Sequence, residues 1–185
     1  MRRTTRLWSL GILLVLVSLM PSTAVAAPPT IEHFRDVGTD VDPDFCGTGQ
    51  AIDVEFDIRG TVWISPQGED VLVRVAERGK VTFTNPDTGQ SLLNTWAQMT
   101  TEQIIEGDGG VETLLITFKG LPSKLKLPHG EVLSRDAGVI AFEITFDATG
   151  EVIDFQVVVN KGPHPEADSD FQLFCEIAVP ALGIT

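Results

Sequence analysis

The sequence predicts an all-β fold, namely a single antiparallel β-barrel of roughly 8–10 strands. Three observations support this prediction. Apolar and polar residues alternate in several segments, tight-turn sequences separate these segments, and no long stretch has a sustained helical period. A β-sandwich fits the same observations and stays open as the alternative architecture.

The first half of the chain contains the clearest alternation. Between residues 52 and 58, apolar side chains alternate with acidic ones, which predicts a strand with one buried face. Shorter alternations follow in residues 62–65, 71–76 and 81–84. Residues 78–79, Arg-Gly, suit a tight hairpin between the last two of these segments. The sequence therefore predicts several short strands joined by turns.

Turns and alternation continue through the second half. Sequences typical of turns lie at 85–89, 107–110 and 147–150. Residues 92–99 also fit a helical spacing, but the turn directly before them favours a strand. The third turn joins residues 140–146 to residues 153–159, and each segment has alternate apolar residues on one face. A last strand is expected near residues 171–179.

The amino terminus has the three zones of a secretory signal peptide. Three arginines precede an uncharged, largely apolar run, residues 7–20, which ends at Pro21 and a stretch of small residues. We expect residues 1–26 to be the signal peptide, with cleavage after Ala26. The apolar run is shorter than the about 20 residues of a membrane-spanning helix. The expected product is therefore a secreted, extracellular protein with no membrane partner after signal cleavage.

The mature chain is predicted to be one acidic domain. Residues 27–45 are expected to form an extended N-terminal arm, and residues 46–185 the β domain. Signal cleavage leaves ten basic and 26 acidic residues, a net charge of −16. Because such a surface repels phosphate backbones, we expect no nucleic-acid partner.

The two cysteines, Cys46 and Cys175, predict one disulfide, because an even count in an exported chain is typical of disulfide bonding. Cys46 precedes the first strong strand, and Cys175 lies within the last predicted strand. A bond between them requires Cα atoms within about 7 Å, so those two strands are expected to be neighbours or to face each other across two sheets, as a Greek-key sandwich also allows. Neighbouring terminal strands close an up-and-down barrel, and for this reason the barrel is preferred to the sandwich.

Three segments resemble those of small secreted proteins from actinobacteria. They are residues 44–49 (DFCGTG), residues 133–138 (LSRDAG) and residues 162–168 (GPHPEAD), the last running on to Leu173-Phe174-Cys175. The resemblance would cover most of the mature chain. It implies export, and because that group has no assigned activity it implies no catalytic residue.

One loop carries a concentration of metal-ligating side chains. The candidates for a metal or polar site are His164, Glu166, Asp168 and Asp170, with His129 as a further ligand if the two loops meet. The alternative is a solvated acidic connection stiffened by prolines. A divalent cation is thus the one cofactor considered, and none is predicted. Residues 40–44 resemble a calcium loop but lack its glycine and its closing glutamate.

No catalytic motif is recognisable, so the sequence favours a non-catalytic protein without excluding an enzyme. If the barrel is hollow, a ligand cavity is expected beside Trp63, Trp96, Phe142 and Phe155. The leading hypothesis is a secreted binding or interaction module for a small apolar ligand or a protein partner. The alternatives are a barrel enzyme of the cyclase or isomerase type, which uses the loop histidines and carboxylates, and a structural extracellular protein.

Overall fold

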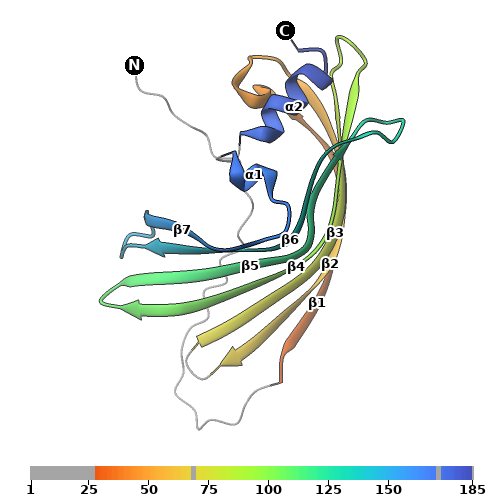
Figure 1. Cartoon of the computed structure of the whole chain (residues 1–185). Coiled ribbons are helices and arrows are strands. Elements are labelled where there is room, and N and C mark those ends of the chain that lie inside the picture. Colours follow the sequence, from red (N-terminus) through yellow and green to blue (C-terminus); the bar gives the residue numbers. More distant parts are fainter. Residues whose placement is uncertain (1–27, 68–69, 170–171, 185) are drawn as a thin grey trace.

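The computed structural model describes residues 28–67, 70–169 and 172–184. The predicted signal peptide, residues 1–26, and one predicted site residue, Asp170, lie outside the described residues. The prediction of an all-β fold is confirmed, since one antiparallel sheet contains most of the described chain (Figure 1).

Seven long strands follow one another as a simple meander in the order β1-β2-β3-β4-β5-β6-β7. The strands are β1 Thr30–Asp42, β2 Ile52–Gln67, β3 Asp70–Thr84, β4 Ser91–Asp108, β5 Val111–Lys126, β6 Val132–Phe146 and β7 Val152–Lys161. A short 3-10 helix, η1 Phe45–Gly47, lies between β1 and β2. Two helices, α1 Pro165–Asp168 and α2 Leu173–Ala181, follow β7.

The sheet is open, so the predicted closed barrel is wrong. Its edges are β1 and β7, and they do not pair with each other. Closure was inferred from Cys175 lying in a last strand, whereas Cys175 lies in α2. The helical period was present in the sequence, because Phe174, Ile177 and Ala178 are spaced at three and four residues and pack into the core.

The strands are fewer and longer than predicted because glycines lie within them rather than between them. Gly60 lies within β2, where the sequence left open whether one strand continues or a second begins, and Gly79 lies within β3, where the sequence favoured a hairpin. A Cβ atom at Gly60 would meet the ring of Phe34 at 2.7 Å, and one at Gly79 would collide with the ring of Trp96. Each glycine thus makes room for an aromatic ring of the neighbouring strand.

Residues 30–42, predicted to be an extended arm, are extended but belong to the sheet as edge strand β1, which pairs with β2 along its whole length. The ambiguous residues 92–99 lie in β4, as predicted. The sheet therefore begins at the amino-terminal end of the described chain, and both of its edge strands are largely exposed.

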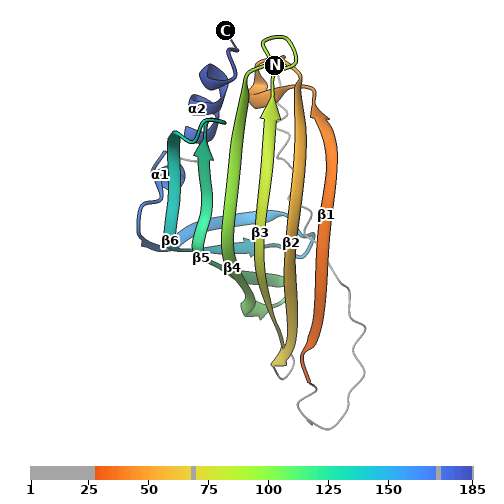
Figure 2. The same cartoon turned by 90° about the vertical axis from the view of Figure 1, so that its right-hand side faces the viewer.

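A second set of glycines lies where the sheet bends. Gly120 of β5 pairs with Gly138 of β6, and Gly162 follows β7 beside them. All three have positive φ, of 116°, 124° and 119°, and the β5–β6 register shifts next to this pair. From this level the ends of β5, β6 and β7 swing away from the direction of β1 (Figures 1 and 2).

The two faces of the sheet differ in chemistry. We call the concave face on the side of the helices the inner face and the opposite one the outer face (Figure 1). Ile52 and Val54 of β2 pack with α2 in the core, which fixes the even-numbered residues of β2 on the inner face. Because directly opposed residues share a face, the register then assigns every other strand.

The compact core occupies only the end of the inner face that α2 covers. Its buried members are Phe45, Ile52, Val54, Phe83, Leu92, Leu125, Ala178 and Leu182. Three rings meet there, those of Phe45, Phe83 and Phe174, with centroids 5.5–5.9 Å apart. The β3–β4 turn holds the end of α2, since Asn85 Nδ2 and Thr88 Oγ1 both donate to the carbonyl of Leu182 at 2.9 and 3.0 Å.

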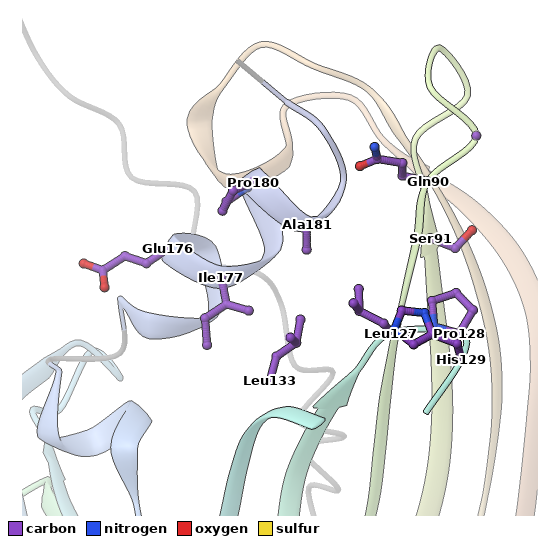
Figure 3. A pocket seen from close by; sticks show the side chains of 11 residues that line it. Gln90, Ser91, Leu127, Pro128, His129, Leu133, Glu176, Ile177, Pro180 and Ala181 are labelled. Carbon is purple, nitrogen blue, oxygen red and sulfur yellow. The ribbon is translucent and has the colours of Figure 1, made fainter. Parts of the chain in front are cut away.

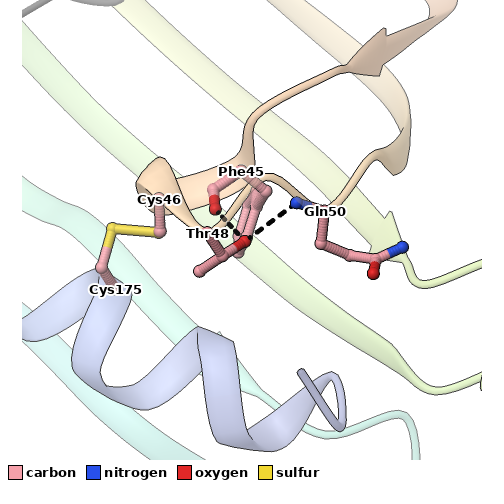
Figure 4. The surroundings of a disulfide bond; sticks show 5 residues. All are labelled: Phe45, Cys46, Thr48, Gln50 and Cys175. Atoms are coloured by element: carbon pink, nitrogen blue, oxygen red, sulfur yellow. Dashed lines mark hydrogen bonds between the residues drawn. A yellow bond between two sulfur atoms is a disulfide. The ribbon is translucent and has the colours of Figure 1, made fainter. Parts of the chain in front are cut away.

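The predicted disulfide is present and ties η1 to α2 (Figure 4). The Cα atoms of Cys46 and Cys175 are 5.6 Å apart. Cys46 has φ 53° in the left-handed region, which L-residues rarely adopt. The surrounding turn is fixed by Thr48, whose hydroxyl donates to the Phe45 carbonyl at 2.7 Å and accepts the Gln50 N–H at 3.2 Å. A disulfide is consistent with an extracellular protein.

Removing the disulfide should destabilise the fold strongly. The cysteines are 129 residues apart, and chain-entropy arithmetic for such a loop gives about 5 kcal/mol as an upper value. We expect the double variant Cys46→Ser/Cys175→Ser to lose several kcal/mol of unfolding free energy in urea denaturation. A loss below about 1 kcal/mol would show that the η1–α2 contact does not depend on the bond.

Adding a side chain at the bend should cost more than adding one at an open turn. A Cβ atom at Gly138 would collide with the Lys161 carbonyl, whereas one at Gly89, with φ 70°, meets no atom within 4 Å. Gly89→Ala should therefore cost about 1 kcal/mol, from backbone strain alone. Gly138→Ala should cost at least about 2 kcal/mol more, measured by urea denaturation. Equal losses would contradict the role of Gly138 in the bend.

Candidate functional site

Beyond the core, the inner face stays apolar but is only partly buried. We call this region the lower inner face. It includes one apolar side chain from each of the strands β2–β7. The six residues are Val62, Val73, Ile104, Ile116, Phe142 and Phe155. The first five are half-buried, and Phe155 is 47% exposed. In Figure 1, α2 lies at the other end of the inner face and α1 lies near the bend, and the main contacts of the two helices with the sheet are those of α2 with β4 and of α1 with β6.

The lower inner face contains a ladder of aromatic rings. Phe118 of β5 contacts Phe142 of β6 edge to face, with centroids 6.0 Å apart, and Phe142 stacks on Phe155 of β7 at 5.3 Å. Trp96 also lies on the inner face, but Trp63 lies on the outer face opposite Arg74. The structure thus brings Phe142 and Phe155 together, places Trp96 on the same face and separates Trp63 from them.

A polar group lies at the bend, between the core and the lower inner face. Glu77 of β3 accepts two hydrogen bonds through Oε1, from Trp96 Nε1 at 3.1 Å and from Gln98 Nε2 at 2.8 Å. The amide oxygen of Gln98 is buried and has no hydrogen-bond partner among the described residues. This group therefore holds a buried amide oxygen without a partner, next to a carboxylate that accepts two hydrogen bonds.

A second carboxylate, that of Glu102, lies within the apolar region itself. In the register Glu102 is flanked by Val73 on β3 and Ile116 on β5. Burial raises the pKa of the Glu102 carboxyl above its ordinary value. Within the described part of the chain, its side chain makes no hydrogen bond or ion pair. A half-buried carboxylate without a partner is costly, which marks Glu102 as a candidate binding residue.

The basic residues are segregated from both carboxylates. All ten that follow residue 27 lie on the outer face by their register. They are Arg35, Arg59, Arg74, Arg78, Lys80, Lys119, Lys124, Lys126, Arg135 and Lys161. Three of them, Arg35, Arg59 and Arg78, stand directly side by side across β1–β3. The inner face of the described sheet thus carries carboxylates and no basic side chain.

A separate pocket of about 770 Å³ lies at the α2 end (Figure 3). Ile177 and Ala181 of α2 face Leu127 and Leu133 across it, and His129 lies at its rim in the β5–β6 turn. The His129 side chain is 69% exposed and approaches Glu131 Oε2 at 3.4 Å. This pocket adjoins the core, so its walls already stabilise α2 against the sheet.

The predicted metal or polar site is divided by the structure. His164 is 1% exposed beside α1, whereas His129 lies at the rim of the α2 pocket, so the two are not brought together. Asp168 is exposed and accepts a hydrogen bond from Asn160 at 3.3 Å. Among the residues that the structure describes, no group of three or more His, Cys, Asp or Glu is placed to hold a metal ion.

His164 and Glu166 instead belong to a buried connection between the sheet and the helices. Asp136 of β6 accepts the backbone N–H of Glu166, and the Glu166 carboxylate accepts the backbone N–H of Phe174 in α2. Burial raises the pKa of both carboxyls, against the opposing effect of these hydrogen bonds. His164 Nδ1 and one oxygen of each carboxylate are buried without a partner among the described residues. The arrangement supports a structural role.

Sequence reasoning did not identify Glu77, Gln98 or Glu102. The signal was present in β4, where the alternation set by Leu92 and Trp96 places Gln98 and Glu102 on the buried face. A charged residue in the inward phase of a strand is the exception that marks a candidate site.

Comparison with known proteins adds no assignment. No family model matches the chain, and no curated protein or solved structure is significantly similar to it. In the described parts of the chain, none of the helices has the length and apolar character needed to cross a membrane. The candidate site therefore rests on its own geometry.

The buried carboxyls should make the fold more stable below neutral pH. A raised folded-state pKa favours the protonated native state, so this contribution is present below the ordinary carboxyl pKa and is lost as pH rises through the raised value. We expect the melting temperature to fall as pH rises above the ordinary carboxyl pKa of about 4. Asp136→Asn should make this slope shallower in thermal melts followed by circular dichroism.

Asp154→Asn is the matched control, because it removes one carboxylate from an exposed position on β7. It corrects for the loss of one negative charge from an acidic chain. If both variants change the slope equally, the pH dependence arises from general charge repulsion rather than from the buried connection.

Proposed function

We propose that this chain is a secreted binding protein that holds a small apolar ligand on the lower inner face of its sheet. The observation that carries the proposal is the apolar surface of β2–β7, which neither described helix covers. Exposed contiguous apolar surface is unusual in soluble proteins and marks interaction or ligand sites.

The shape of the sheet supports a ligand rather than a buried core. The bend at Gly120, Gly138 and Gly162 turns β5–β7 across the concave side of the sheet (Figures 1 and 2). By the register, the aromatic ladder and the apolar side chains of β2 and β3 lie on this same concave face. The sheet reaches this shape without closing, so β1 and β7 stay unpaired edges on either side of this face. A ligand can therefore enter without unfolding of the helical end.

The expected affinity follows from the apolar contact. Each methylene group removed from water contributes about 0.8 kcal/mol, so a chain of about ten carbons gains about 8 kcal/mol before the costs of association. Loss of translational freedom and partial exposure of the site reduce this figure. A dissociation constant in the micromolar range is the expected result.

The disulfide and the predicted signal peptide support the proposal that the protein binds its ligand outside the cell. The compact end of the molecule, with the disulfide, the three-ring cluster and the hydrogen bonds of Asn85 and Thr88 to Leu182, holds the sheet in shape. The uncovered end is then free to bind.

Binding of the neutral dye Nile red tests the proposal. The wild-type protein should increase its fluorescence saturably in the micromolar range. Ile116→Asp places a charge on the lower inner face and should weaken binding at least about tenfold, or about 1.4 kcal/mol. Thr117→Asp is the matched control, because Thr117 is the next residue of β5 and lies on the outer face.

Thr117→Asp should bind within about twofold of wild type, since it carries the same charge on the opposite side of the strand. Circular dichroism of each variant checks that the sheet is intact. Absence of saturable binding by the wild type, or an equal loss in the two variants, would reject the lower inner face as a binding site.

A further inference from the structure

We propose that the ligand of the lower inner face is an amphiphile with a cationic head, whose ammonium group pairs with Glu102 while its apolar chain lies across β5–β7. The inference rests on the proposed function and names the class of ligand. Three observations carry it, and each concerns the described residues of the inner face.

The first observation is a row of residues in direct register. Glu102 of β4 is opposite Ile116 of β5, Ile116 is opposite Phe142 of β6, and Phe142 is opposite Val157 of β7. Neighbouring strands are about 4.8 Å apart, so the row spans about 14 Å, comparable with an extended chain of about twelve carbons. A carboxylate at one end and apolar side chains along the remainder match the two parts of an amphiphile.

The second observation is that Glu102 has no counterion in the described chain. Both of its cross-strand neighbours, Val73 and Ile116, are apolar. Charges in partly buried apolar surroundings are stable when an opposite charge and hydrogen bonds satisfy them. A primary ammonium group supplies one positive charge and three donors, which a carboxylate accepts well.

The third observation is the electrostatic sign of the whole inner face. Every basic residue after residue 27 lies on the outer face, so no side chain of the described inner face can neutralise an anionic head. The polar group at the bend adds a second carboxylate to this face, that of Glu77. An ammonium is attracted here, whereas a carboxylate or phosphate is repelled.

A series of ligands with one chain and three heads tests the inference. Dodecylammonium, dodecanol and dodecanoate, each below its micelle concentration, compete with Nile red for the wild-type protein. Dodecylammonium should bind at least about tenfold more tightly than dodecanoate, with dodecanol between them. This part of the test needs no variant.

Two variants then locate the head group. Glu102→Gln should weaken dodecylammonium about tenfold and leave dodecanol unchanged, because only the charged contact is lost. Glu143→Gln is the matched control, since Glu143 is a half-buried carboxylate on the outer face of β6, opposite Leu115. It should leave the affinity of all three ligands within about twofold of wild type.

The outcomes separate the inference from the proposed function. Equal affinities for the three heads, or tighter binding of dodecanoate, would overturn the cationic head while leaving the apolar site in place. Failure of all three compounds to displace Nile red, together with no saturable dye binding, would overturn both. An equal loss for Glu102→Gln and Glu143→Gln would show a general charge effect and overturn the pairing with Glu102.

Discussion

The inner face of this sheet carries apolar side chains on both sides of the polar group at the bend, yet only the end beyond that group is packed into a core by α2. The apolar part of the inner face is larger than the part that packs against the helices, and the rest of the structure depends on this difference. At the covered end, the disulfide and the ring cluster of Phe45, Phe83 and Phe174 produce a compact core. At the other end, apolar side chains remain partly exposed, and this exposure is the observation behind the proposed binding role.

The bend and the charge distribution act together on that uncovered end. Glycines at the bend let β5–β7 turn across the concave side, while the register sends every basic residue after residue 27 to the outer face. The result is a concave surface that is both apolar and acidic. Among the carboxylates of this surface, that of Glu102 lies between apolar neighbours, Val73 and Ile116.

Features that depend on one segment of the chain could be predicted from the sequence. Alternation in residues 52–58 and 140–146 correctly predicted strands with one apolar face, and the cysteine count correctly predicted the disulfide. Closure of the sheet and the site residues depend on contacts between distant segments. Gly79 is typical of a turn in the sequence, but in the fold it makes room for the ring of Trp96 on the next strand. Glu102 differs from other acidic residues only through its apolar neighbours on the adjacent strands, which the sequence does not reveal.

Amide hydrogen exchange with and without dodecanol, a neutral ligand, measures most directly where an apolar molecule binds. The account predicts slower exchange in β4, β5 and β6 around residues 102, 116 and 142, with no change at the α2 end. Slower exchange confined to α2 and the β5–β6 turn would place the ligand in the pocket beside His129 and contradict the account.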